Sequence, residues 1–343
     1  MAPPVSSAAP VGPDAWDGIG VSIAEVEDQL AEQRRPPGGG IPFSLSGVLN
    51  LVAYAPTVDE LGPMQEVIEG LADHQASRTI MIVESAEGSG MDASVSTSCR
   101  LMEDHPTMAL ELVVLTIRGE TREGEASAAM PLLRSELPTV LWWPGPPDTA
   151  AGSSLAALAG LADRVVTEAG RAHDAAAALR ALAGWAPGEE GPAVTDLAWA
   201  AITPWRQLIV QVLDPESLSA VRPGAQVVIV HSAPDPDVTT LLMAGWLRDL
   251  LGPAAGVELR PRDAARSGGL LAVEIEGSTG RRLHVERLPG RDAATVTVNE
   301  PDGTVRARTL PLPDPHRARL LAGELEIQRR DRVFERALAL AVP

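Results

Sequence analysis

An apolar strand, a helix and a second strand follow one another early in the chain. The run from Leu45 to Tyr54 is typical of a strand, and the run from Thr79 to Val83 predicts a second one. Between them, apolar residues recur at helical spacing, at Leu61, Met64, Val67, Ile68 and Leu71. A β-α-β unit of this kind requires parallel strands and a right-handed crossover, so an α/β sheet is expected.

Further segments extend this sheet and complete one domain. Strands are predicted at Ala93 to Cys99, Leu110 to Ile117, Leu137 to Trp143 and Arg164 to Thr167, and helices near Glu123 to Leu133, Leu155 to Leu161 and Asp174 to Trp185. The segment from Pro187 to Pro192 combines turn formers with charge and is the clearest break. We therefore predict a disordered lead-in over residues 1–20, an N-terminal α/β domain over 21–190 and a C-terminal α/β domain over 191–343.

The C-terminal domain has a different pattern. Val227 to Val230 predicts a buried strand, and Asp235 and Pro236 open a helix that contains Trp246. Short alternating runs then predict an antiparallel meander, at Leu270 to Ile275, Leu283 to Arg287, Thr295 to Val298 and Val305 to Leu310. One or two helices follow over residues 314–340. The fold class is α/β (α+β): a mixed N-terminal sheet with flanking helices, then an α/β unit, the meander and terminal helices.

Two abutting helices are predicted at the start of the second domain. Thr195 is expected to cap the first, and Thr203 to cap the second with Pro204 at its first position. Arg206 then falls in the first turn, where a cation opposes the helix dipole. An anionic group is expected to compensate this charge, either an internal carboxylate or a group of a partner or ligand.

Composition excludes several classes of function. The formal net charge of −18 opposes binding to nucleic acid or to anionic membranes, and no apolar run approaches the ~18 residues of a membrane span. The chain contains no lysine and a single cysteine, Cys99, so a P-loop, a Schiff base and a cysteine-rich zinc site are all excluded. The histidines are scattered singly. We expect no catalytic residues, no metal, no bound cofactor and a cytoplasmic location.

Trp142 and Trp143 end an apolar strand that stops at Pro144 and Gly145. Neighbouring strand residues point to opposite faces, so the two indoles cannot pack in the same layer. One of them is expected to face outward at the strand end, where α/β proteins place ligands and partners. The alternative is that both rings are buried between the sheet and its helices.

Eight sequence blocks along the chain form a recognisable series: Val48-Leu49-Asn50-Leu51-Val52, Ser77-Arg78, Pro131-Leu132-Leu133, Leu137-Pro138, Trp142-Trp143-Pro144-Gly145, Asp196-Leu197-Ala198-Trp199, Thr203-Pro204-Trp205-Arg206 and Asp331 with Val333-Phe334-Glu335. Taken together, these blocks resemble the OpcA family of glucose-6-phosphate dehydrogenase assembly proteins. The resemblance runs over nearly the whole length. Two positions depart from the family pattern: Ala201-Ile202 stands where an arginine is frequent, and Thr167-Glu168 where Asp-Ser is frequent.

The resemblance implies a non-catalytic protein. It would bind glucose-6-phosphate dehydrogenase, promote the active oligomer and activate the enzyme allosterically, feeding NADPH production through the oxidative pentose phosphate pathway. A binding protein needs no chemistry, because differential affinity for one conformation or oligomer shifts the population. We expect the enzyme-facing residues to be Trp142, Trp143, Pro144, Gly145, Trp199, Thr203, Trp205 and Arg206.

Two alternatives stay open at this point. The chain could be an enzyme or sensor that binds a sugar phosphate or nucleotide at the ends of the strands, with Arg206 and Arg78 as phosphate clamps. It could also be a structural scaffold for another complex.

Overall fold

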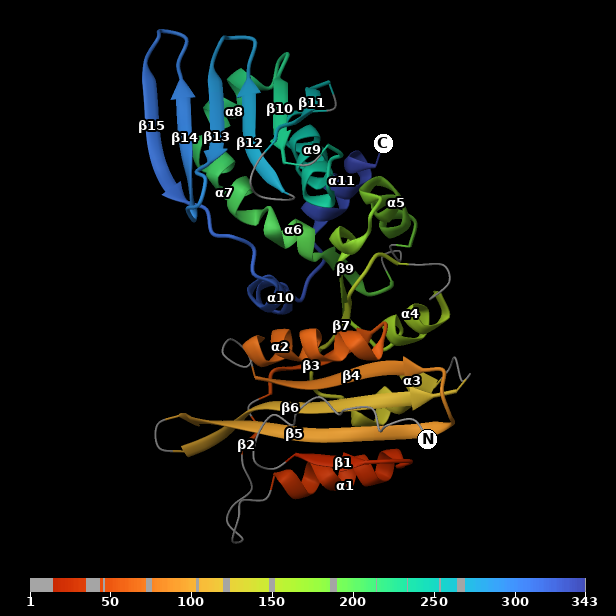
Figure 1. Cartoon of the computed structure of the whole chain (residues 1–343). Helices are drawn as coiled ribbons and strands as arrows, with labels where there is room; N and C mark the ends of the chain where they lie inside the picture. The colour runs from red at the N-terminus through yellow and green to blue at the C-terminus, as the bar shows by residue number, and fades with distance from the viewer. Residues whose placement is uncertain are drawn as a thin grey trace.

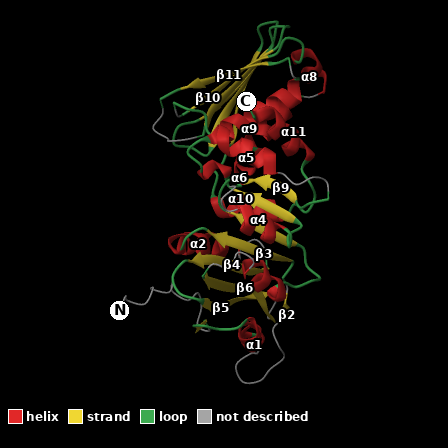
Figure 2. Ribbon diagram, turned by 90° about the vertical axis from the view of Figure 1, so that its right-hand side faces the viewer, coloured by secondary structure: helices red, strands yellow, loops and turns green. Residues whose placement is uncertain are grey.

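The computed structural model describes the chain over residues 15–34, 44–45, 47–71, 76–102, 105–119, 124–147, 152–185, 190–213, 215–232, 234–252, 254–263 and 269–342. Within these ranges the chain forms two mixed sheets at opposite ends of an elongated molecule, with helices between them (Figures 1 and 2). Residues 1–14 of the expected lead-in and 187–189 of the expected break lie outside the described ranges.

The first sheet has a parallel centre that confirms the β-α-β prediction. Its neighbouring strands are, in order, β6 (His105–Arg118), β4 (Ser77–Ser85), β3 (Leu49–Ala55), β7 (Thr139–Trp143), β8 (Arg164–Thr167) and β9 (Ala193–Asp196). Three more strands extend the β6 side: β5 (Gly90–Met102) and β1 (Trp16–Gly18) are antiparallel, and β2 (Ser44–Leu45) pairs with β6. Residues 16–18, which we assigned to the disordered lead-in, are therefore an edge strand.

Helices bury both faces of this sheet, because its strand residues are apolar on both sides. One face packs against α2 (Leu61–Leu71) and α10 (Arg317–Leu325). The other packs against α1 (Ile23–Gln33), α3 (Gly124–Ala129) and α4 (Gly152–Ala159). Short 3-10 helices occur at η1 (Val58–Glu60), η2 (Met130–Leu132) and η3 (Ala169–Arg171).

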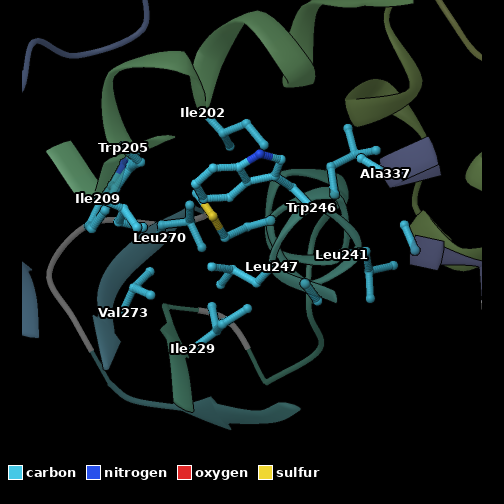
Figure 3. Packing of buried hydrophobic residues seen from close by; sticks show 14 of the residues in the cluster. Ile202, Trp205, Ile209, Ile229, Leu241, Trp246, Leu247, Leu270, Val273 and Ala337 are labelled. Carbon is cyan, nitrogen blue, oxygen red and sulfur yellow. The ribbon is translucent and has the colours of Figure 1, made fainter. Parts of the chain in front are cut away.

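The second sheet confirms the meander. Its strand order is β11 (Gly256–Pro261), β10 (Gln226–His231), β12 (Leu270–Glu276), β13 (Arg282–Arg287), β14 (Ala293–Asn299) and β15 (Val305–Pro311). Among the described strands of this sheet, β10 and β11 pair in parallel and the other neighbouring pairs are antiparallel. One face packs against α5 (Ala175–Trp185), α6 (Leu197–Ala201), α7 (Thr203–Val212), α8 (Pro215–Val221), α9 (Val238–Leu251) and α11 (Arg332–Ala341), with Trp205 and Trp246 in this core (Figure 3).

The α/β fold class is confirmed, and the domain division at 190/191 stays a prediction. Two elements from beyond that division lie with the first sheet: β9 pairs with β8, and the helix α10 packs beside α2 over one of its faces. Neither β11 nor α8 was expected, since β11 has little apolar alternation and α8 is short.

The caps of the two abutting helices differ from the expectation. Asp196, not Thr195, caps α6, because Thr195 lies inside β9 and the Asp196 side chain accepts from the Ala198 N–H at 2.8 Å. Thr203 is the first residue of α7, and its hydroxyl donates to the Trp199 carbonyl at 3.3 Å instead of capping.

Candidate functional site

The two tryptophans of β7 do not face solvent. Trp142 is fully buried and Trp143 is 5% exposed. They do point to opposite faces, with Trp142 in the core under α2 and α10, and Trp143 in the core under α3 and α4. The expected outward indole is wrong, because helices cover both faces of the sheet at this point.

Specific contacts hold both indoles. The Trp142 Nε1–H donates to Glu168 Oε1 at 2.6 Å, and Arg317 pairs with the same carboxylate at 2.8 Å. The Arg317 guanidinium also lies 4.8 Å from the Trp142 ring centroid. On the other face Trp143 stacks on Tyr54, with centroids 4.3 Å apart. The pair is therefore part of the interior of the protein.

The turn after β7 is also used internally. The Pro144 carbonyl accepts from Arg171 Nη1 at 3.2 Å, and the Gly145 carbonyl accepts from the Glu168 N–H at 3.2 Å. Pro144 is buried and Gly145 is half-buried. This turn ties β7 to the segment after β8.

Trp199 and Trp205, on α6 and α7, are buried as well. Trp199 is 1% exposed and Trp205 is 3% exposed. The Trp199 Nε1–H donates to Asp331 Oδ2 at 2.7 Å, and Asp331 in turn caps α11. Of the expected partner-facing side chains in this block, Thr203 and Arg206 are the two that line a pocket at the surface.

Arg206 is a half-buried cation held by an aromatic ring. Its Cζ lies 3.5 Å from the Trp199 ring centroid, and Nη2 donates to Thr203 Oγ1 at 2.6 Å. Within the described ranges no carboxylate forms an ion pair with it, and its Nε is buried without a partner. Burial lowers the pKa of Arg206 to about 10, against the opposing attraction of Asp331 and Glu324. The group is still charged at neutral pH, and a cation–π contact stands where we expected an anion.

An open pocket of about 560 Å³ lies beside this guanidinium. Its walls consist of two amides, a hydroxyl, the guanidinium and apolar surface, from Thr203, Arg206, Gln207, Val210, Gln211 and Trp246. Gln207 and Gln211 are exposed, and Val210 is 50% exposed. Among the described residues no acidic side chain lines it.

Sequence reasoning found Thr203 and Arg206 but missed the rest of this pocket. Gln207, Val210 and Gln211 follow them at spacings of three and four residues, so one face of a helix carries them all. That spacing could have identified them. Trp246 comes from α9 and carries no sequence signal that links it to α7.

The second expected phosphate clamp is not available. Arg78 is 8% exposed, and its Nε donates to Glu111 Oε2 at 2.7 Å while Nη1 donates to the Leu132 carbonyl at 2.9 Å. The Arg78 side chain is therefore engaged in a buried ion pair. The prediction that Arg78 and Arg206 together clamp a phosphate is wrong.

The same ranges hold neither a metal-binding cluster nor a membrane-spanning helix. Within the part of the chain that the structure describes, no three His, Cys, Asp or Glu side chains gather as a metal site. Of the helices described there, none is both long enough and apolar enough to span a bilayer. The Cys99 side chain lies outside the described residues.

Fold and pocket together define a two-sheet α/β protein with an open pocket beside α7. Two family models, described as the N-terminal and the C-terminal domain of the glucose-6-phosphate dehydrogenase subunit, match residues 69–184 and 192–338 respectively. Both are OpcA models, and the N-terminal model matches ahead of the C-terminal one along the chain. The chain belongs to the OpcA family.

One curated relative and one solved structure are also similar to the chain, each at 25% sequence identity or less. "Putative OxPP cycle protein OpcA" of Synechocystis sp. is 25% identical over 202 residues, which is 58% of this chain and 41% of the relative. The matched region thus spans less than half of that relative's length. An E. coli structure described as "Trehalose-6-phosphate from E. coli bound with UDP-2-fluoro glucose" is similar at a TM-score of 0.25 and 9% identity, covering 63% of this chain and 65% of the other. A likeness at that level carries no argument about function.

Proposed function

We propose that this protein binds glucose-6-phosphate dehydrogenase without catalysing a reaction itself, promotes its active oligomer and activates it allosterically. The family assignment supports a role with this enzyme in the oxidative pentose phosphate cycle. The activated dehydrogenase would then produce more NADPH in the cytoplasm. The contact surface is the solvent-facing side of α7.

The exposed apolar side chain of Val210 is the observation that carries this surface. Val210 is 50% exposed beside the exposed amides of Gln207 and Gln211, on a helix whose opposite side is fixed in the core by Trp205 and Ile209. Protein interfaces combine an apolar centre with a polar rim, on elements that stay rigid. The surface of α7 has these features.

Activation follows from binding alone. If the protein binds one oligomer or conformation of the enzyme more tightly than another, it shifts the population by that difference in affinity. A coupling free energy of about 1–3 kcal/mol changes the affinity of the enzyme for its own ligand about 5–150-fold. Side chains of this protein need not enter the active site.

The test compares two exposed valines. Val210→Arg places a charge at the centre of the α7 surface, whereas Val305→Arg places the same charge on β15, where Val305 is 62% exposed. The purified chain is mixed with the dehydrogenase from the same organism. The molar mass of the complex and the rate of the dehydrogenase reaction are then measured on the same mixture. We expect Val210→Arg to weaken association about tenfold or more, by about 1.4 kcal/mol, and Val305→Arg to leave it unchanged.

Two results would contradict the proposal at different levels. Wild-type affinity and activation in Val210→Arg would exclude the α7 surface as the contact. A wild-type chain that neither associates with the dehydrogenase nor changes its rate would exclude the function itself.

A further inference from the structure

We infer that the pocket beside Arg206 is a binding site for a small oxyanion, a phosphate monoester or carboxylate carried on a neutral body with hydroxyl groups. The inference rests on the chemistry of the pocket and not on the proposed function. It assigns a ligand to a surface that the family match leaves without one.

Arg206 has hydrogen-bond donors to spare. A guanidinium carries five N–H groups, and among the described residues one of those of Arg206 is engaged, by Thr203 at 2.6 Å. Stacking at 3.5 Å on Trp199 fixes the plane of the group, and the Thr203 bond fixes its rotation. A planar fork held in this way is already arranged for the two oxygens of a carboxylate or phosphate.

The charge of Arg206 is also incompletely compensated. Buried arginines elsewhere in this protein contact carboxylates directly: Arg164 with Glu324 at 2.5 Å, and Arg78 with Glu111 at 2.7 Å. Arg206 is desolvated enough to lower its pKa to about 10, yet it has no such partner among the described residues. An anion in the adjoining pocket would supply the missing contact.

The remaining walls specify the rest of the ligand. Gln207 and Gln211 offer amide donors and acceptors, which suit hydroxyl groups, and Trp246 and Val210 offer an apolar surface. Among the described residues the lining brings no carboxylate that would repel an anion. About 560 Å³ lies within the usual range of small-molecule sites, roughly 300–1,000 Å³.

The experiment is a calorimetric titration of the full purified chain at constant ionic strength. The probes are glucose 6-phosphate, inorganic phosphate and glucose, which separate the oxyanion from the neutral body. We expect saturable binding of glucose 6-phosphate, weaker binding of inorganic phosphate and no binding of glucose. Arg206→Gln should weaken the binding of glucose 6-phosphate at least about tenfold, because a charge-assisted hydrogen bond between the guanidinium and the phosphate is lost.

A second variant avoids any effect on folding. Gln207 is exposed, so Gln207→Glu adds a negative charge at the pocket without removing a core contact. We expect this variant to weaken the binding of glucose 6-phosphate at least about fivefold. Two like charges about 4 Å apart repel each other by about 1 kcal/mol even in water, which corresponds to that factor. The matched control is Arg260→Gln on β11, where Arg260 pairs with Glu258 at the surface. This variant should bind glucose 6-phosphate with the affinity of wild type.

Three outcomes would overturn the inference. They are equal binding of glucose, binding that both pocket variants leave unchanged, and the absence of saturable binding of either oxyanion at millimolar concentration. If no small oxyanion binds but both pocket variants weaken association with the dehydrogenase, Arg206 receives a carboxylate of the partner. That result would refute the small-molecule site and leave the proposed function standing.

Discussion

A buried glutamate beside an exposed one should make the stability of this protein fall as the pH rises toward neutrality. Glu125, on α3, is 2% exposed, and its Oε1 lies 3.4 Å from Ser154 Oγ. The same hydroxyl lies 3.2 Å from Glu84 Oε1, which also accepts from Tyr54 at 3.2 Å. Ser154 has one hydrogen for two carboxyl groups. A proton on Glu125 allows Ser154 to contact both.

The magnitude follows from the pKa of Glu125. Burial, and next the neighbouring Glu84, raise this pKa from 4.5 to about 7. A raised carboxyl pKa stabilises the fold fully below the unfolded value of 4.5, and this contribution is lost as the pH rises through about 7. Each pKa unit corresponds to about 1.4 kcal/mol, so the total is about 3 kcal/mol, and most of it is lost between about pH 5 and pH 8.

The assay is urea unfolding of wild type and Glu125→Gln across this range. The glutamine keeps the shape of the side chain and does not titrate, so the difference in free energy of unfolding between the two proteins isolates this one group. We expect wild type to lose roughly 2–3 kcal/mol of unfolding free energy relative to Glu125→Gln between about pH 5 and pH 8. Parallel pH profiles for the two proteins would refute a buried protonated carboxyl at this position.

Two further predictions concern the core. Arg164→Met leaves Glu324 buried without its cation, so urea unfolding should show a loss of about 3–5 kcal/mol, much of it recovered when Glu324→Met is added; a small loss in the single variant would contradict the buried ion pair. Gly245→Ala places a methyl group against the Ala337 carbonyl where α9 crosses α11, and should cost about 1–3 kcal/mol or more. Its control is Gly184→Ala on α5, where the added carbon meets no atom within 4 Å, and which should be neutral or stabilising by up to about 1 kcal/mol; equal effects at both glycines would contradict the close helix contact.

The elements of this fold could largely be predicted from local patterns. The β-α-β unit and the meander each depend on periodicity within a few residues, and the strand Arg164–Thr167 has the bounds expected of it. Caps were less certain, because Thr195 and Asp196 are both good capping residues. Only the end of β9 decides between them.

The exposure of the motif tryptophans could not be predicted in the same way. Strand alternation correctly places Trp142 and Trp143 on opposite faces. Whether a face is open depends on what covers it, and Trp142 is covered in part by α10, a segment more than a hundred residues further along the chain. The group that stabilises the charge of Arg206 could not be predicted for the same reason. Trp199 contacts both Arg206 and Asp331, and the contact with Asp331 forms only in the folded chain.

The motif tryptophans fasten the C-terminal segment to the rest of the protein. Trp142 and Arg317 share Glu168, and the Trp199 indole donates to the residue that caps α11, Asp331. Residues that resemble a docking surface in the sequence are therefore internal anchors. Arg206 is joined to one of these anchors, because it stacks on Trp199.

This arrangement connects the α7 pocket to the interior of the protein. A ligand or partner that moves the Arg206 guanidinium changes the environment of Trp199, and through its indole N–H the cap of α11 at Asp331. α11 packs along α9, which contributes Trp246 to the same pocket. Both walls of the pocket are thus joined by direct contacts. If the protein activates the dehydrogenase as proposed, this linkage would make its affinity for the enzyme depend on whether an anion occupies the pocket.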